Sequence, residues 1–258
     1  MSIDACAEKV RTGDPDRFLS ALVAPADLRS RLMVLYAFNL EIARAPWVSN
    51  EPMINEMRLQ FWADTVDEIA AGKPARAHEV AEPLADLINK ANLPCDILGQ
   101  MVQARRFDVH KDPHESVSAL AEYALATSGN LMWCAAVALG ATPENRQTVM
   151  SFGQAVGIAN LMRSYAHLVG LHHEPLADAS DAELRGLAAN ALEMLKSARK
   201  KRAIIPAVCK AALLAGWQAD AVLKIVLADP SKVKSGQLDL PEFSRRARLL
   251  YRTSTGRW

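Results

Sequence analysis

The sequence predicts an all-α fold, built as one helical domain over residues 1–258. Half of the 258 residues are hydrophobic while only 6% are aromatic, and Ala and Leu, which favour helices, dominate the composition. No run of alternating β-branched residues is bounded by turn-forming pairs, so the evidence for strands is thin. No linker, low-complexity segment or internal repeat divides the chain, and a single helical domain is therefore the simplest architecture.

Two helices, expected over residues 25–46 and 52–71, organise the rest of the chain. The first begins near Pro25, because a proline loses no hydrogen bond in a first helical turn, and ends near Pro46, because the residue before a proline avoids the α region. The second ends at Gly72, which tolerates left-handed backbone. Its apolar stripe has helical spacing and consists of Ile54, Met57, Phe61, Thr65 and Ile69, widened by Trp62 and Val66.

The other helices of the first half are short and are separated by turn residues. In chain order, we expect them over residues 3–11, 15–23, 76–91 and 94–109. Glycine and proline mark the breaks between them, at Thr12–Pro15, Gly72–Pro74, Asn92–Pro94 and Lys111–Pro113.

The second half contains the longest expected helices. Ser116 is a good N-cap for a helix that runs to Gly140, with small residues at its centre that allow close helix approach. Another helix should run from Pro143 to about Leu171, with two glycines, Gly153 and Gly157, on one face. Ser180 to Glu183 fits a capping box, and the helix that it opens ends in a basic run. Three shorter helices complete the chain, over residues 204–215, 218–228 and 241–252.

The charge is distributed unevenly along the chain. Residues 190–258 hold 14 Lys and Arg against 5 Asp and Glu, a surplus of nine, whereas residues 1–189 hold 16 against 24, a deficit of eight. The net charge of +1 argues against generic nucleic-acid binding. The basic third is consistent with a face for phosphate headgroups or an acidic partner, and equally with an ordinary solvated surface.

No targeting or membrane-spanning segment is recognisable. The N-terminus lacks a basic start and an apolar stretch, and no window holds about 18 uninterrupted apolar residues. The four cysteines are far apart in sequence and form no CxxC pair, which is typical of thiols in a reducing compartment. Any membrane contact should therefore be peripheral.

The segment Tyr36-Ala37-Phe38, followed by a polar stretch, resembles the first signature of the squalene/phytoene synthase superfamily. These enzymes join two prenyl diphosphates in an all-helical fold of the isoprenoid synthase type, using Mg²⁺ held by two aspartate clusters. The resemblance extends to Asn160 and Arg163 of the second signature. The five positions that match metal-binding aspartates are all without a carboxylate: Ala43, Arg44, Trp47, Ser164 and Leu168. At about 4 Å and an effective dielectric near 20, the Arg44 cation would repel a metal ion by roughly 4 kcal/mol per unit charge.

Three further segments are similar to one branch of the superfamily, the non-enzymatic respiratory complex I assembly factors of mitochondria and their α-proteobacterial relatives. The segments are Phe38–Arg44, Ser49–Pro52 and Met57–Trp62. This resemblance implies a pseudoenzyme without cofactor or metal, whose partners are complex I subunits or assembly intermediates. It implies a cytoplasmic location, peripheral to a bacterial inner membrane. An anionic membrane surface and an isoprenoid lipid remain open as further partners. The alternatives are a prenyl diphosphate-condensing transferase with altered metal ligands and an isoprenoid or quinone carrier.

Two sets of site residues follow from the resemblance and the charge pattern. A substrate-like cavity should be lined by Tyr36, Phe38, Asn39, Arg44, Asn160 and Arg163. A partner or membrane should contact Arg58, Gln60, Trp62, Lys200, Lys201 and Arg202. No catalytic or metal-binding residue is expected.

Other ionisable clusters have simpler interpretations. Asp108 matches a further aspartate of the superfamily, or else forms an ion pair with Arg105 within one helical turn. The acidic group Asp64, Asp67 and Glu68 is expected on a solvated helix face, and the histidines His167, His172 and His173 on a loop surface, because their spacing does not place all three on one face.

Overall fold

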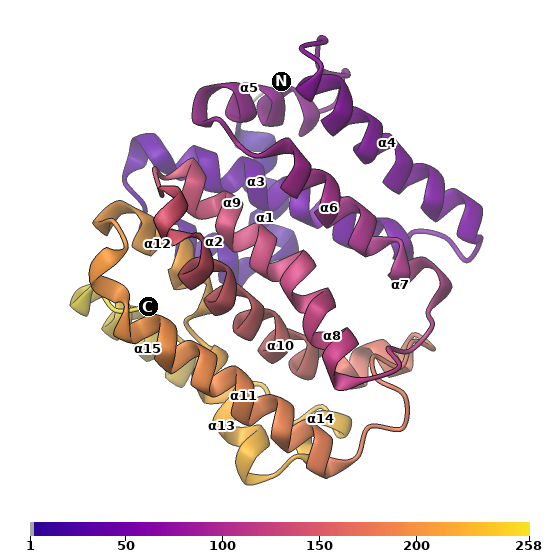
Figure 1. Ribbon diagram of the computed structural model, residues 1–258, viewed down its shortest axis with the longest axis vertical. Helices are drawn as coiled ribbons and strands as arrows, with labels where there is room; N and C mark the ends of the chain where they lie inside the picture. The colour runs from indigo at the N-terminus through magenta and orange to yellow at the C-terminus, as the bar shows by residue number, and fades with distance from the viewer. Residues whose placement is uncertain (1–2) are drawn as a thin grey trace.

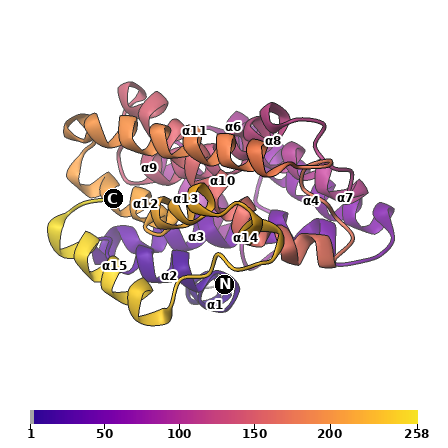
Figure 2. The same cartoon turned by 90° about the horizontal axis from the view of Figure 1, so that it is seen from below.

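Two long helices, α3 (Ala26–Arg44) and α10 (Arg146–Gly170), form the centre of the computed structural model, which describes residues 3–258 (Figure 1). Nine consecutive residues of α3, from Leu32 through Leu40, are buried, so this helix is covered on all sides. Figure 2 shows α11 along one side of this central layer, with α1, α2 and α15 along the other. No strand occurs within residues 3–258, where one isolated bridge joins His114 and Leu176.

The helices of the first half lie close to their expected positions. They are α1 (Ile3–Gly13), α2 (Pro15–Ala21), α4 (Pro52–Ala70), α5 (Ala81–Ala91), α6 (Cys95–Arg105) and α7 (Phe107–His110), with a 3-10 turn over Ala45–Trp47 after α3. The expected start of α5 at residue 76 is wrong. Its first turn is replaced by a local one in which Val80 N–H donates to His78 Nδ1 at 3.1 Å, a side-chain bond that competes with the helix.

The second half contains α8 (Val117–Ala124), α9 (Asn130–Ala138), α10, α11 (Asp181–Lys200), α12 (Lys210–Leu213), α13 (Ala219–Ala228), α14 (Ser231–Lys234) and α15 (Glu242–Thr255). The Ser116 N-cap and the Ser180–Glu183 capping box are both present. The helix expected over 204–215 is instead broken into 3-10 turns around α12, and α14 was not predicted.

A π-helical turn, Leu125–Gly129, joins α8 to α9 and packs against α10. The contact depends on the two glycines of α10. A Cβ atom on Gly153 would lie 2.8 Å from Met132 Cβ and 2.9 Å from the carbonyl oxygen of Ser128. A Cβ on Gly157 would lie 2.6 Å from Ser128 Cβ. The small residues expected to allow close approach therefore do so at this crossing.

The stretch Ala207–Ala228 is long and apolar enough, by composition, to cross a membrane, with a mean hydropathy of 1.5 over an 18-residue window. In the fold it comprises α12, short 3-10 turns and α13, and 67% of that window is buried. Its largest side chain, Trp217, is 1% exposed. The segment is thus core of this fold, in which hydropathy reflects burial against other helices.

Candidate functional site

A cleft of about 540 Å³ lies between α3, α10 and the π-helical turn. Residues of the α1–α2 junction and of the start of α13 also line it. Its lining includes three carboxylates and three guanidinium groups, from Asp14, Asp16, Asp239, Arg17, Arg105 and Arg163. The charges of these six side chains sum to zero.

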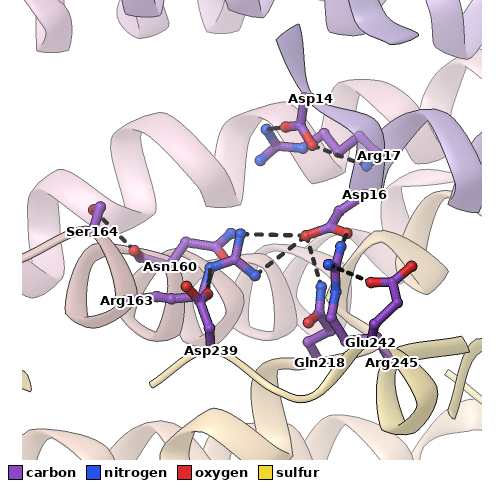
Figure 3. Close-up of polar contacts among 10 residues, drawn as sticks. All are labelled: Asp14, Asp16, Arg17, Asn160, Arg163, Ser164, Gln218, Asp239, Glu242 and Arg245. Carbon is purple, nitrogen blue, oxygen red and sulfur yellow. Dashed lines mark hydrogen bonds and ion pairs between the residues drawn. The ribbon is translucent and has the colours of Figure 1, made fainter. Parts of the chain in front are cut away.

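Asp16 is the centre of the polar network at the cleft (Figure 3). Its Oδ2 atom accepts hydrogen bonds from Gln218 Nε2 at 2.7 Å and from both terminal nitrogens of Arg163 at 3.3 Å. Its Oδ1 atom accepts from Arg245 of α15. Burial alone would lower the pKa of Arg245, but the hydrogen bond and charge of Asp16 outweigh it and raise that pKa above its usual value. One carboxylate therefore joins α2, α10, α13 and α15.

Local sequence explains why Asp16 points into the cleft. Asp14 is the N-cap of α2, and its Oδ1 atom accepts from the Arg17 N–H at 3.0 Å. Pro15 follows at the first helical position, where no N–H is required. Arg17 also donates to Asp14 Oδ2 at 2.6 Å and places its guanidinium 5.8 Å from the Tyr36 ring centroid. The cap thus fixes the first turn of α2 beside α10.

A second polar cluster adjoins the cleft and is more deeply buried. Asp108 Oδ2 accepts from Tyr123 Oη at 2.6 Å and from Arg105 Nη1 at 3.3 Å, and the Asp108 side chain is 6% exposed. Burial raises the pKa of Tyr123 well above its usual value, so its hydroxyl remains a donor. Burial would lower the pKa of Arg105, but Tyr123 and Asp108 outweigh it and raise that pKa. The expected Arg105–Asp108 ion pair is confirmed, with Tyr123 as a third member.

The residues at the matched metal positions do not fit a Mg²⁺–diphosphate site. Ala43 offers no ligand atom, Arg44 is a cation, and the Ser164 hydroxyl donates to the Asn160 carbonyl of its own helix at 3.0 Å. Trp47 packs edge-to-face on His173, with ring centroids 5.4 Å apart. Among residues 3–258, no group of three or more His, Cys, Asp or Glu could hold a metal ion. The donor set required for diphosphate ionisation is therefore not assembled.

The six residues expected in the cavity are divided between the cleft and the core. Asn39, Asn160 and Arg163 line the cleft. Tyr36 and Phe38 do not, because they point into the core and are 2% and 0% exposed. Arg44 is exposed and does not line the cleft. Its guanidinium lies against Gly13, which does line the cleft.

The residues expected to contact a partner are also divided. Lys200, Lys201, Arg202, Arg58 and Gln60 are exposed. Trp62 is 3% exposed and packs edge-to-face on Phe38 at 5.5 Å, so its place in a contact surface is corrected to the core. His173, expected on a loop surface, is likewise buried, because Trp47 covers it.

Sequence reasoning did not find Asp16 and Gln218 as cleft residues, nor Arg245 as a partner of Asp16. They come from positions up to 229 residues apart, so no local pattern relates them. The Asp14-Pro15 dipeptide marks the start of the helix expected over residues 15–23, which the structure confirms, but it does not indicate what Asp16 binds.

Comparison with known proteins agrees with this geometry. The family model described as squalene/phytoene synthase matches residues 10–250. Solved structures with the same fold include a dehydrosqualene synthase, with a TM-score of 0.82, 15% identity and coverage of 98% of this chain and 95% of that one. Another is the squalene synthase HpnC from Alicyclobacillus acidocaldarius, with a TM-score of 0.72, 16% identity and coverage of 91% and 94%.

Curated relatives carry a different name, complex I assembly factor 6. The bovine protein is 30% identical over 160 residues, covering 62% of this chain and 48% of its own length. The Drosophila melanogaster homologue is 30% identical over 201 residues, covering 74% and 59%. The chain thus spans about half the length of the mammalian relatives that it matches.

Proposed function

Because the chain belongs to the squalene/phytoene synthase family while its cleft lacks that family's metal ligands, we propose that it is a non-catalytic assembly or accessory factor for respiratory complex I. The observation that carries this proposal is the Asp16 network. Arg163 and Arg245 both bind Asp16, which lines the cleft. These two guanidinium groups are therefore already paired with a carboxylate of the protein itself. The relatives named complex I assembly factor 6 support the choice of complex.

The exposed face of α4 is the surface that we assign to the client subunit. Met53 is 75% exposed and Met57 is 67% exposed, one turn apart on the same face, with Val48 and Ile54 also exposed nearby. Exposed apolar groups that lie together mark interaction sites, and methionine adapts to irregular partner surfaces. Arg58 and Gln60 lie beside them and can supply polar contacts at the rim. The proposed partner is thus a subunit or assembly intermediate with an apolar contact patch.

The proposed location is the cytoplasmic side of a bacterial inner membrane, with peripheral attachment. Support comes from the exposed cations Lys200, Lys201 and Arg202 at the end of α11. Cations near an anionic leaflet contribute about 1 kcal/mol each to attachment. Client binding and membrane attachment are thereby assigned to different faces.

Affinity capture tests the client assignment. The tagged chain, expressed in its host and captured from membranes in mild detergent, should retain complex I subunits. Met53→Gln/Met57→Gln should reduce their recovery at least about tenfold, because burying each methionine contributes roughly 1.5 kcal/mol or more. Leu19→Gln/Leu22→Gln is the control, because both side chains are 39% exposed and lie at the end of α2, away from α4, so recovery should be unchanged. Capture of no complex I subunit by the unmodified chain would contradict the proposal.

We predict no condensation of prenyl diphosphates. Farnesyl or geranylgeranyl diphosphate incubated with Mg²⁺ or Mn²⁺ should release no pyrophosphate above a heat-inactivated control, because no carboxylate stands at the five matched positions. Metal-dependent release would favour the alternative of a transferase with altered ligands.

An isoprenoid or quinone carrier is the second candidate function, favoured by the persistence of a cleft of about 540 Å³. Native mass spectrometry of the purified protein would reveal a bound prenyl lipid. Ala43→Trp, which places a large side chain in the lining of the cleft, should then abolish that adduct.

A further inference from the structure

Helix α15 presents its apolar side to the exterior. Phe243 is 85% exposed, Leu250 is 71% exposed and Tyr251 is 54% exposed, and Ala247 between them is exposed as well. Their spacing places these four residues, the apolar stripe of α15, on one face of the helix. No residue of α15 is buried. A surface helix usually packs such a stripe against the protein core. Here the apolar side chains are exposed, which is typical of a surface that binds another partner.

The arginines of α15 hold the helix in this orientation. Arg245 binds Asp16, and Arg252 Nη2 donates to Asp220 Oδ1 at 2.7 Å. The Arg252 side chain is only 11% exposed. Two ion pairs to different elements thus fix the polar face of α15 toward the protein. Figure 2 shows α15 at the edge of the molecule, with the chain returning from it to the C-terminal residue.

A basic pocket of about 450 Å³, here called the arginine pocket, lies between α15 and the end of α11. Its charged lining consists of Arg199, Arg202, Arg248, Arg252, Arg257 and Asp220. Five guanidinium groups against one carboxylate leave a surplus of four positive charges. A free carboxylate at Trp258 would still leave a surplus of three. The pocket therefore requires anions that these side chains do not provide.

Hydrogen-bond donors in the pocket are also unmatched. Arg199 Nε donates to the Trp258 oxygen at 2.7 Å, but the buried Arg199 Nη2 has no hydrogen-bond partner, and its nearest ion-pair oxygen, Asp220 Oδ1, is 3.9 Å away. Within residues 3–258, the side chains of Arg202 and Arg248 make no hydrogen bond or ion pair. Leaving a buried charged donor unpaired is costly, and guanidinium groups match phosphate oxygens in geometry.

We propose that the arginine pocket and the apolar stripe together form a docking site for an anionic phospholipid membrane. The pocket accepts the phosphate of a lipid headgroup, and Phe243 and Leu250 insert at the level of the first acyl carbons. Tyr251 belongs to both features, because it lines the pocket and lies on the stripe, so a headgroup and its chains can be engaged together. A basic helix with an exposed apolar face is typical of segments that lie in a membrane interface.

Charge complementarity favours this occupant over a soluble phosphate compound. Lys200 and Lys201, which are exposed and lie next to Arg199 and Arg202 in the chain, add further cations beside the pocket. A single phosphate would neutralise only part of that charge, and it would leave the apolar stripe exposed. An anionic bilayer covers both. This inference rests on the membrane attachment in the proposed function, but not on the identity of the client.

Vesicle co-sedimentation of the full chain tests the proposal. The vesicles contain either phosphatidylcholine alone or a mixture of phosphatidylcholine and phosphatidylglycerol. Arg202→Gln/Arg248→Gln should weaken binding to the mixed vesicles about 30-fold, since each arginine near an anionic surface contributes roughly fivefold. Phe243→Gln/Leu250→Gln should weaken it at least about tenfold. Among the residues that the structure describes, the side chains of Arg202 and Arg248 have no ion pair, and those of Phe243 and Leu250 are exposed, so the fold should be unaffected.

Two matched controls separate the site from general properties of the chain. Lys232→Gln/Lys234→Gln removes the same charge from α14, at the opposite end of α13 from the pocket, a distance of about 15 Å that exceeds the Debye length. Met53→Gln/Met57→Gln removes equivalent exposed apolar groups from α4. Both controls should bind mixed vesicles within about twofold of the unmodified chain.

Three results would overturn the proposal. The first is equal binding of the chain to both kinds of vesicle. The second is equal loss in the α14 control and the arginine-pocket variant, which would indicate a non-specific charge effect. The third is displacement by millimolar glycerol phosphate with no effect of Phe243→Gln/Leu250→Gln, which would identify a site for soluble phosphate. Client capture is measured with the α4 and α15 variants in a separate experiment from vesicle binding. Loss of membrane binding can therefore be distinguished from loss of client binding.

Discussion

Replacing Gly153 with alanine is expected to lower the free energy of unfolding by about 3 kcal/mol. The added Cβ would lie 2.8 Å from Met132 Cβ, 2.9 Å from Ser128 O and 3.0 Å from Gly129 Cα. Two of these are backbone atoms, which cannot rotate away, so α10 and the π-helical turn must separate. Alanine's better helix propensity offsets at most about 1 kcal/mol of the loss. Urea denaturation followed by circular dichroism measures the change.

Gly186 of α11 provides the matched control. It is exposed, and a Cβ there would meet nothing within 4 Å. Gly186→Ala should therefore raise the free energy of unfolding by about 0.5–1 kcal/mol, through helix propensity alone. If Gly153→Ala were also neutral or stabilising, the close crossing of α10 with the π-helical turn would not be a feature of the folded protein.

The helices that sequence reasoning located well are those whose ends are set by local chemistry. Pro25, Pro52 and the Ser180 capping box mark starts that the structure retains. The capping signal is decided within a few residues, so tertiary contacts cannot easily override it. Resemblance supplied the isoprenoid synthase fold, which the solved structures confirm.

Most of the expectations that were wrong depended on tertiary contacts. The helix expected over 204–215 is broken first at Pro206, which holds Ile205 in an extended conformation. It ends in a 3-10 turn at Gly216, which fits against Phe152 and Val156, so that a Cβ there would lie 2.4 Å from Val156 Cγ2. Periodicity cannot register that approach. Trp62 was assigned to a contact surface by its position beside polar residues, but its contact with Phe38 from α3 buries it.

The local sequence could not predict the polar contacts of the cleft and of the arginine pocket, because these also depend on tertiary contacts. Asp16 meets Gln218 and Arg245 only because α2 packs beside the start of α13 and beneath α15. Arg202 and Arg248, which both belong to the basic C-terminal third, line one pocket after folding. The composition predicted the surplus of positive charge in the C-terminal third. The gathering of that charge in one pocket depends on the ion pairs that hold α15 against the protein.

Replacing Asp108 with alanine is expected to lower the free energy of unfolding by about 3 kcal/mol, because breaking a buried ion pair leaves an uncompensated charge. Arg105, whose side chain is 18% exposed, would lose the only carboxylate that it pairs with among residues 3–258, and Tyr123 would lose its acceptor. Asp86→Ala is the control. Asp86 pairs with Lys90 at 3.4 Å, with both side chains 73% exposed, so its loss should change stability by less than about 0.5 kcal/mol.

The Asp108 measurement also separates two reasons for an aspartate at a position that matches a family signature. If Asp108 supports the fold, Tyr123→Phe should cost about 1 kcal/mol. Arg105→Met/Asp108→Leu, which removes both charges, should then be less destabilising than Asp108→Ala, because no unpaired cation remains. Equal losses in the single and double variants would mean that Arg105 and Asp108 are not coupled. Unchanged stability in Asp108→Ala would direct attention to a ligand of the cleft, since Arg105 and Tyr123 both line it.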